Sequence, residues 1–334
     1  MKFFVIGSNS FSGSSFINFL TTKNYEVIGA SRSKNIDNIF LPYSWGNTYS
    51  KVCNKKNLKT YQIDLNKDLN KLMSLLDNHK PDYIINYAAQ GMVAESWENP
   101  THWYKTNLVS QVALHDELRK RTYLKKYIHI TTPEVYGDTS NWTKENYDFS
   151  PTTPYAVSRA SCDLHLLSFF KAYNFPVIFT RAANVYGPGQ QLYRIIPRTI
   201  LSCITGEKLN LHGGGYSERC FIHIDDVNNA LFKLINEAEI GTSWHISTEN
   251  TISIRNLVKK ICSLMNVEFE DIVLETVERL GKDQNYLLSS NLLRDKFDWK
   301  DKISLDEGIK DTIKWVEMNM LKIKKMSWEY QHKK

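Results

Sequence analysis

The sequence predicts an α/β fold with a doubly wound parallel sheet and a smaller C-terminal α/β lobe. Three observations support this prediction. Short apolar, β-branched runs alternate with amphipathic helical segments over the first 180 residues. The first run, residues 2–6, leads into a glycine-containing turn and a helical segment. After residue 180 the alternation loosens. We therefore expect 1–180 to form the sheet domain, 181–320 a second lobe interleaved with it, and 321–334 a basic tail.

Composition and charge exclude several classes of protein. The 334-residue chain is 42% hydrophobic and 23% charged, as ordinary globular proteins are. Its net charge of +6 gathers in runs such as 322–325 and 333–334, which predicts a solvated tail and no nucleic-acid partner. The five cysteines are scattered and form no C-x-x-C pair, so we expect no disulfide framework and no bound metal. They also predict a reducing compartment. With no signal peptide and no apolar run of about 20 residues, we expect a cytoplasmic protein with no membrane partner.

The N-terminal strand, turn and helix have the pattern of a Rossmann-type dinucleotide site. Gly7 permits the tight turn after the strand, and Gly13 lets the helix pack closely on it. Ser10 stands where such sites usually have a further glycine, and Phe11 leads into the helix whose free N–H groups can receive a pyrophosphate. We therefore predict that Gly7, Ser10, Phe11 and Gly13 contact the cofactor.

The next strand ends are expected to complete this cofactor site. The second strand, residues 25–30, is followed by Ser31 and Arg32. A basic residue at this position accommodates the 2′-phosphate of NADP, so we predict NADP, with NAD as the alternative if Arg32 is an ordinary loop residue. The other predicted cofactor contacts are Asp64 and Leu65 in the third strand (61–65), Ala88, Ala89 and Gln90 after the fourth (82–87), and Asn107, which can equally be a packing residue of its helix.

Four residues around a fifth strand, 126–130, are candidates for catalysis. Thr132 and Glu134 follow this strand at its carboxyl end, where open α/β sheets hold their ligands. Tyr155 and Arg159 lie four residues apart at the start of a helix, on one face of it. The guanidinium is expected to lower the pKa of the phenol, and the Glu134 carboxylate supplies a second proton-transfer group. The alternative is a packed surface tyrosine beside a solvated arginine.

The second half of the chain offers groups for an anionic substrate. Guanidinium groups match phosphate bidentately, so arginines near the predicted cleft favour a diphosphate ligand over an ordinary surface role. The predicted substrate contacts are Asn184, Arg194, Arg198, Arg219 and Arg279.

With these motifs in hand, the chain resembles the extended short-chain dehydrogenase/reductases, and within them the nucleotide-sugar 4,6-dehydratases. The resemblance covers about residues 1–315. The C-terminal motifs are most similar to dTDP-glucose 4,6-dehydratases. The residues 88–90 and the basic Arg32 are most similar to GDP-mannose 4,6-dehydratases. Two residues depart from the pattern: Arg159 replaces the lysine that follows the catalytic tyrosine, and Pro133 replaces the aspartate of the dTDP-glucose enzymes. The motifs that carry the resemblance are residues 7–13, 88–90, 131–137, 155–159, 181–187, 219–227 and 279–283.

The resemblance implies an NAD(P)-dependent enzyme that makes a 4-keto-6-deoxy sugar for deoxysugar or cell-surface polysaccharide synthesis. Tyr155 would take the C4 hydroxyl proton as hydride passes to the nicotinamide, and Glu134 the C5 proton before water leaves from C6. Thr132 would bind the C4 oxygen, Arg159 would tune Tyr155, and the cofactor would stay bound. The resemblance also implies a homodimer, for which residues 164–167 offer an apolar face.

Other readings of the same scaffold remain open at this point. A nucleotide-sugar 4-epimerase or a uronate decarboxylase would also need oxidation at C4, although an epimerase has no use for Glu134. The departures at Pro133 and Arg159 are also compatible with a catalytically silent protein that binds NADP or a nucleotide sugar. Neither the nucleotide nor the sugar has a local signature in the sequence.

Overall fold

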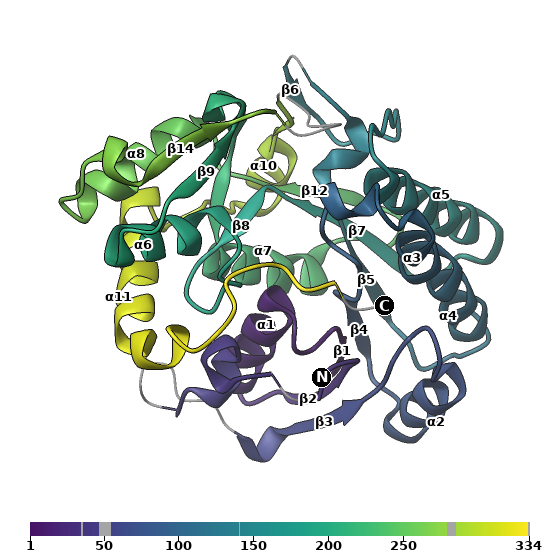
Figure 1. The fold of residues 1–334 in the computed structure, drawn as a ribbon. Helices are drawn as coiled ribbons and strands as arrows, with labels where there is room; N and C mark the ends of the chain where they lie inside the picture. Colours follow the sequence, from purple (N-terminus) through teal and green to yellow (C-terminus); the bar gives the residue numbers. More distant parts are fainter. Residues whose placement is uncertain (35, 47–54, 140, 279–284, 333–334) are drawn as a thin grey trace.

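A seven-stranded parallel sheet forms the centre of the computed structural model, which describes residues 1–34, 36–46, 55–139, 141–278 and 285–332 (Figure 1). The strand order is β12-β7-β5-β4-β1-β2-β3, the doubly wound arrangement that the sequence predicts. The strands are β1 (Lys2–Ile6), β2 (Glu26–Ser31), β3 (Leu58–Gln62), β4 (Tyr83–Asn86), β5 (Lys126–Thr131), β7 (Val177–Ala182) and β12 (Ser243–Ile246).

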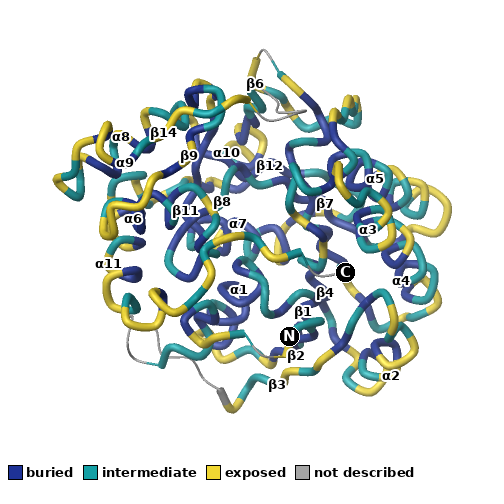
Figure 2. The backbone as a smooth tube through the Cα atoms, in the orientation of Figure 1, coloured by how far each residue is buried: buried dark blue, intermediate teal, exposed yellow. Residues whose placement is uncertain are grey.

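Both faces of the sheet are buried, because helices cover each of them. Within β1, Phe3 and Val5 belong to the core that includes residues of α1 (Phe11–Thr22) and α7 (Ile224–Glu237). Phe4 and Ile6 belong to the opposite core, shared with α2 (Leu69–His79), α4 (Ser110–Leu118) and α5 (Pro154–Tyr173). Figure 2 shows most positions of the central strands as buried. Successive side chains point to opposite faces, which explains why these strands are apolar at most positions and do not alternate with polar residues.

One sequence expectation about strands is wrong. The third strand ends at Gln62, so Asp64 and Leu65 follow β3 and do not belong to it. Two short strands, β10 (Glu218–Arg219) and β11 (Phe221–His223), follow each other in the second half of the chain. The strand β12 was not expected from the sequence, and its register places Trp244 opposite Thr180 of β7. The sheet therefore takes its edge strand from the second half of the chain.

The remaining elements pack beside the carboxyl ends of the strands. The helices α6 (Ile195–Thr205), α8 (Ile254–Leu264) and α11 (Leu305–Ile323) share one core, in which Ile200, Leu257 and Trp315 are fully buried. Four two-stranded sheets lie outside the central one. Three are parallel: β8 (Asn184–Tyr186) pairs with β11, β9 (Leu209–His212) with β14 (Val273–Thr276), and β6 (Trp142–Thr143) with β15 (Leu287–Leu288). The fourth is antiparallel and pairs β10 with β13 (Ile252–Ser253). The remaining helices are α3 (Pro100–Tyr104), the short α9 (Phe269–Ile272) and α10 (Asn291–Phe297).

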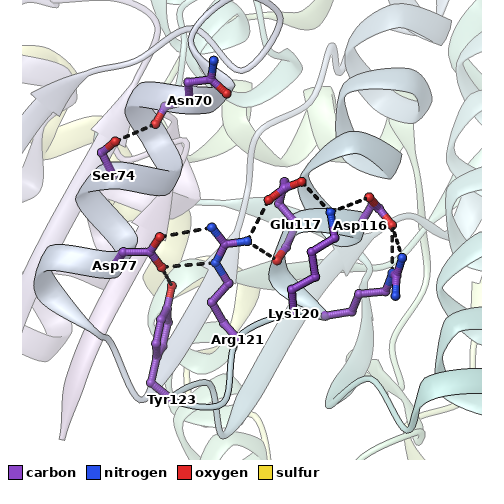
Figure 3. A network of polar contacts seen from close by, with 9 residues as sticks. Asn70, Ser74, Asp77, Asp116, Glu117, Lys120, Arg121 and Tyr123 are labelled. Atoms are coloured by element: carbon purple, nitrogen blue, oxygen red, sulfur yellow. Dashed lines mark hydrogen bonds and ion pairs between the residues drawn. The ribbon is translucent and has the colours of Figure 1, made fainter.

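A charged network joins α2 to the end of α4 on the outer surface (Figure 3). Arg121 donates to both carboxylate oxygens of Asp77, over 3.2 and 3.1 Å, and to Glu117 over 2.7 Å. Lys120 pairs with Glu117 at 2.7 Å and with Asp116 at 3.1 Å. These groups are partly solvated, so we expect each pair to contribute at most about 1 kcal/mol.

Residues 326–332 pack on the molecule, whereas Lys322, Lys324 and Lys325 before them are exposed, as expected for that lysine run; residues 333–334 lie outside the described residues. Trp328 donates its indole N–H to the Ile323 carbonyl over 3.0 Å, and the His332 ring stacks on Trp103. Along this segment the exposed residues Ser327, Glu329 and Gln331 alternate with half-buried ones, which are Met326, Trp328, Tyr330 and His332. Within the described ranges, no helix combines the length and apolar character needed to cross a membrane.

Candidate active site

Three of the four predicted catalytic side chains meet at the carboxyl end of β5. Thr132 follows this strand and begins the turn that carries Glu134 (η7, Pro133–Tyr136). The Thr132 hydroxyl donates to Glu134 Oε2 and also contacts the Tyr155 hydroxyl. Tyr155 stands in the first turn of α5, where the Thr153 side chain accepts the Ala156 N–H over 3.1 Å as the N-cap. A threonine, a carboxylate and a phenol thus form one hydrogen-bonded group.

The electrostatic expectation for Tyr155 is only half right. The Arg159 charge does act to lower the pKa of the phenol, as predicted. Burial of the ring is the larger effect, and the Glu134 carboxylate adds to it, so together they raise the pKa of Tyr155 to about 12. The phenol is therefore protonated in the ligand-free protein.

Arg159 is buried beside the sheet and is not a solvated helix residue. Its Nη2 donates to the Ile130 carbonyl, and its Nε has no hydrogen-bond partner among the described residues. A buried N–H of this kind fits a ligand hydroxyl group, since an unmade hydrogen bond costs about 1–3 kcal/mol.

The sequence analysis missed a charged cluster behind this site. Asp163 lies one helical turn after Arg159 and is completely buried. Its Oδ2 accepts from Arg181 Nη2 over 2.6 Å and from the Thr131 hydroxyl over 3.0 Å, and its Oδ1 lies 3.0 Å from His129 Nε2. Despite burial, the Arg181 charge and the other polar neighbours hold the pKa of Asp163 below its usual value. The spacing of Asp163 from Arg159 was the available signal in the sequence.

The glycine turn after β1 has the shape of a dinucleotide cradle. Gly7 has a φ of +83°, and a Cβ there would lie 2.9 Å from the backbone nitrogen of Ala88. A Cβ on Gly13 would collide with the Gly7 carbonyl. Ser10 is the N-cap of α1, because its hydroxyl accepts the Gly13 N–H over 3.1 Å and donates to the Gly7 carbonyl over 2.7 Å. Phe11 begins α1 with its ring in the core, so only its backbone remains for a phosphate group.

The loop after β4 is held from behind by Asn107. The Asn107 side chain accepts the Gln90 N–H over 2.8 Å and donates to the Gln90 carbonyl over 3.1 Å and to Ser158 Oγ over 3.0 Å. These bonds use both amide hydrogens of Asn107. We therefore assign to Asn107 the positioning of the loop at Gln90, in place of the direct cofactor contact predicted from the sequence. Asn107 lies in a π-helical turn (η6, Lys105–Val109), a deviation that is frequent at functional sites. Ala88 is half-buried and Ala89 exposed.

A hollow lies where the adenosine end of a dinucleotide is expected. Arg32 lines it, close to the ends of β2 and β3, whereas Leu65 is buried in the core behind β3. Ser31 ends β2, and its carbonyl accepts the Ile63 N–H over 3.0 Å. Three cations and two carboxylates give the hollow a positive balance. Its lining residues are Arg32, Ser33, Gln62, Asp64, Lys67, Asp68 and Lys71.

Two of the five predicted substrate residues lie close together in the structure. Asn184 and Arg219 meet at Tyr286, whose hydroxyl donates to Asn184 Oδ1 over 2.9 Å and whose ring lies 4.0 Å below the Arg219 guanidinium. Tyr286 is half-buried, and partial burial followed by the Glu134 charge raises its pKa, which places it near Glu134 in the site. Tyr286 was not predicted from the sequence, although it lies three residues after the motif 279–283.

The other three arginines differ in their surroundings. Arg194 is the N-cap residue of α6, and its charge acts on Tyr155. Arg198 is held by the C-terminal segment, since Glu329 lies 3.2 Å from it and the Trp328 ring 5.4 Å away. Arg279 lies outside the described residues.

The chain is similar to known proteins over most of its length. The family model for GDP-mannose 4,6 dehydratase matches residues 4–312. A trifunctional UDP-glucose 4,6-dehydratase/3,5-epimerase/reductase of Arabidopsis thaliana is 31% identical over 242 residues, which are 71% of this chain and 36% of the relative. This chain therefore spans about a third of the length of that relative. A dTDP-glucose 4,6-dehydratase of Haemophilus influenzae is 25% identical over 346 residues, covering 96% of this chain and 98% of the relative.

Solved structures share the fold. The dTDP-glucose 4,6-dehydratase of Streptomyces venezuelae with NAD bound has a TM-score of 0.85 at 24% identity, covering 96% of this chain and 98% of that one. A UDP-glucose 4-epimerase of Thermotoga maritima has a TM-score of 0.84 at 24% identity, covering 96% and 100%. At this level of identity the likeness concerns the fold, which dehydratases and epimerases have in common.

Proposed function

Because this chain belongs to the GDP-mannose 4,6-dehydratase family, we propose that it is a nucleotide-sugar 4,6-dehydratase that converts a nucleoside-diphosphate hexose into its 4-keto-6-deoxy derivative. One observation carries the proposal: the Glu134 carboxylate lies in a single hydrogen-bonded group with Thr132 and close to Tyr155. A base and a phenol at one site suit removal of one proton from a sugar hydroxyl group and of another from the adjacent carbon.

The residues divide the reaction between them. Tyr155, once ionised, accepts the proton of the C4 hydroxyl, while Thr132 donates a hydrogen bond to the C4 oxygen. A bound nicotinamide dinucleotide would supply the redox chemistry, taking a hydride from C4 and returning it to C6. Glu134 then removes the C5 proton, which the C4 ketone makes acidic.

Pro133 gives Glu134 a second task. An aspartate at this position would protonate the departing C6 oxygen, and proline has no proton to give. After taking the C5 proton, Glu134 is itself a carboxylic acid, so the same group can deliver that proton to the C6 oxygen as water leaves. These two transfers leave Glu134 ionised again. When the hydride returns to C6, C5 takes up one proton from solvent, and Tyr155 releases to solvent the proton that it took from the C4 hydroxyl, so that both groups are ready for the next turnover.

We propose NADP as the cofactor, with NAD as the alternative. Arg32 carries this preference, and Lys67 and Lys71 beside it add positive charge to the hollow that Arg32 lines. The carboxylates Asp64 and Asp68 oppose it and keep NAD open. The solved dehydratase of Streptomyces venezuelae holds NAD.

Two other activities use the same oxidation at C4. A 4-epimerase needs no base at C5, so the position of Glu134 favours elimination. A uronate decarboxylase needs a cation at the C6 carboxylate, for which Arg194 is the candidate because its charge reaches Tyr155. A silent binding protein would retain the cofactor and convert no sugar.

We also propose a cytoplasmic homodimer that serves deoxysugar or cell-surface polysaccharide synthesis. The α5 face supports a dimer contact, since Leu164 is 48% exposed there and Val109, next to α4, is 61% exposed.

The deciding experiment incubates the purified protein with dTDP-, UDP-, GDP- and CDP-hexoses and NADP or NAD, and follows product mass. Loss of water from one substrate without net cofactor reduction establishes the 4,6-dehydratase and its nucleotide. An isomer of unchanged mass identifies an epimerase, and loss of carbon dioxide from a uronate identifies a decarboxylase. Tight cofactor binding without any conversion identifies the silent protein.

A further inference from the structure

Residues 326–332, which we call the C-terminal strap, form a separate feature of the molecule. The chain leaves α11 at Ile323 and crosses in front of α1 in Figure 1 before it ends. The strap has no regular secondary structure, and its half-buried side chains are Met326, Trp328, Tyr330 and His332. Aromatic side chains in an irregular segment bury apolar area only by packing on other elements, so their partners reveal what the strap does.

The strap contacts both the C-terminal lobe and the sheet domain. At its beginning, the Arg198 guanidinium lies over the Trp328 ring at 5.4 Å and pairs with Glu329 at 3.2 Å, both contacts with α6. The Tyr330 ring then meets Tyr193, just before α6, at 5.4 Å and 79°. These contacts join the strap to the C-terminal lobe.

The far end of the strap lies on the sheet domain. The His332 ring stacks on Trp103 of α3 at 5.0 Å and an interplanar angle of 8°. Its Nε2 lies 2.8 Å from His102 Nδ1, and its Nδ1 lies 3.2 Å from the Tyr330 hydroxyl. Tyr330 and His332 therefore join α6 to α3 by one continuous chain of ring contacts.

The strap passes by α1, whose first turn belongs to the predicted dinucleotide cradle (Figure 1). Burial, with the neighbouring Tyr193 and Glu95, raises the pKa of Tyr330 to about 12, while the charges of Arg32 and Arg194 act on it in the opposite direction. Arg32 marks the adenosine end, and Arg194 also acts on the catalytic Tyr155. A dinucleotide that runs from Arg32 to Tyr155 would pass close to Tyr330.

We propose that the C-terminal strap closes over the bound dinucleotide and retains it through repeated turnovers, and that it opens at the contact of His332 with Trp103. This inference rests on the cofactor part of the proposed function. A 4,6-dehydratase returns its hydride to the sugar, so it has no need to exchange the cofactor. Loss of the reduced form in mid-cycle would strand a keto sugar. The strap is held by a few side-chain contacts at exposed backbone, so it can open without unfolding the sheet.

The test measures how fast the dinucleotide leaves. The protein is loaded with NADPH, or with NADH if that binds more tightly, and mixed with excess oxidised cofactor while NAD(P)H fluorescence is followed, with no sugar present. In the variant that combines Tyr330→Ala and His332→Ala we expect roughly tenfold faster dissociation, because each lost aromatic contact weakens the closed form several-fold. Gln331→Ala, an exposed position between them, is the matched control and should dissociate as the parent does. A chain that ends at Lys325 provides an independent variant.

Each outcome decides the inference. Dissociation at the parent rate in both strap variants refutes it. Faster association with unchanged dissociation also refutes it, because the strap would then obstruct entry and not retain the ligand. A parent protein that binds neither dinucleotide refutes the strap and the cofactor proposal together. Strap-dependent retention in a protein that dehydrates no sugar overturns only the proposed activity.

Discussion

Replacing Glu134 by glutamine should separate oxidation of the sugar from elimination of water. The amide keeps the size of the side chain and can still accept from Thr132, but it takes no proton from C5. A positioned acid/base group contributes about 10²–10⁴-fold to a rate, so Glu134→Gln should slow elimination by that factor. We expect no comparable loss of the preceding step at C4.

The effect on the C4 step follows from the charge next to Tyr155. A pKa of about 12 leaves roughly one phenolate in 10⁴ molecules at pH 8. After burial, the Glu134 carboxylate is the largest cause of this raised pKa, so its removal lowers the pKa. Every unit of decrease gives about tenfold more phenolate at a fixed pH below the pKa. Oxidation at C4 should therefore be as fast as in the parent protein, or faster.

Two signals measured in single turnover separate the steps. Absorbance at the reduced-nicotinamide band follows C4 oxidation, and mass spectrometry in deuterated water follows exchange at C5 and loss of water. Glu134→Gln should accumulate reduced cofactor without C5 exchange. Tyr155→Phe, the control, should abolish both signals. If Glu134→Gln loses both in parallel, Glu134 is not a separate base and the assignment of roles is wrong.

Three further predictions concern stability and cofactor choice. Asp163→Asn should lower the free energy of unfolding by about 3–5 kcal/mol in urea titrations, because it leaves the buried Arg181 without its counter-ion. Asp77→Asn, at a surface pair, should cost less than about 1 kcal/mol, and equal losses would contradict the argument. Burial lowers the pKa of His245 to about 3, so the unfolded chain binds the extra proton as pH falls below about 6.5. As pH falls from 6.5 to 3, His245 should lower the free energy of unfolding by up to about 1.4 kcal/mol per pH unit. The variant His245→Asn should therefore show a smaller decrease of Tm on acidification, and an unchanged decrease would rule this out. Arg32→Asp should shift the ratio of NADP to NAD affinity toward NAD by at least tenfold in binding titrations, and an unchanged ratio would remove the basis for proposing NADP.

Most of the sheet domain was predictable because its signals are local. An apolar run, a glycine turn and a helix start lie within the first 13 residues, and backbone sterics make Gly7 and Gly13 necessary there. The pairing of Thr132 with Glu134 follows from two residues of spacing at a strand end. Tyr155 comes from another segment and was grouped with them from the motif; in the structure its hydroxyl group contacts Thr132.

What the sequence analysis missed depends on contacts between distant segments. The strand β12 adds to β7 across 60 residues, and its short sequence has no pattern of its own. Tyr286 reaches Asn184 from about 100 residues away, and the pairing of Asp163 with Arg181 needs α5 to lie on β7. The pKa of Tyr155 was mispredicted because the neighbouring charge is visible in the sequence, whereas the burial that outweighs it is not.

By itself the sequence determined the doubly wound sheet and the glycine turn after its first strand, and it selected the residues proposed for catalysis, since each depends on backbone geometry or on spacing within one segment. Only the tertiary structure decided which charges are buried, that Asn107 serves the loop behind the site, and that the C-terminal strap lies on α6 and α3. Burial and long-range packing are properties of the whole chain, because the free energy of a buried group depends on neighbours that folding alone brings to it.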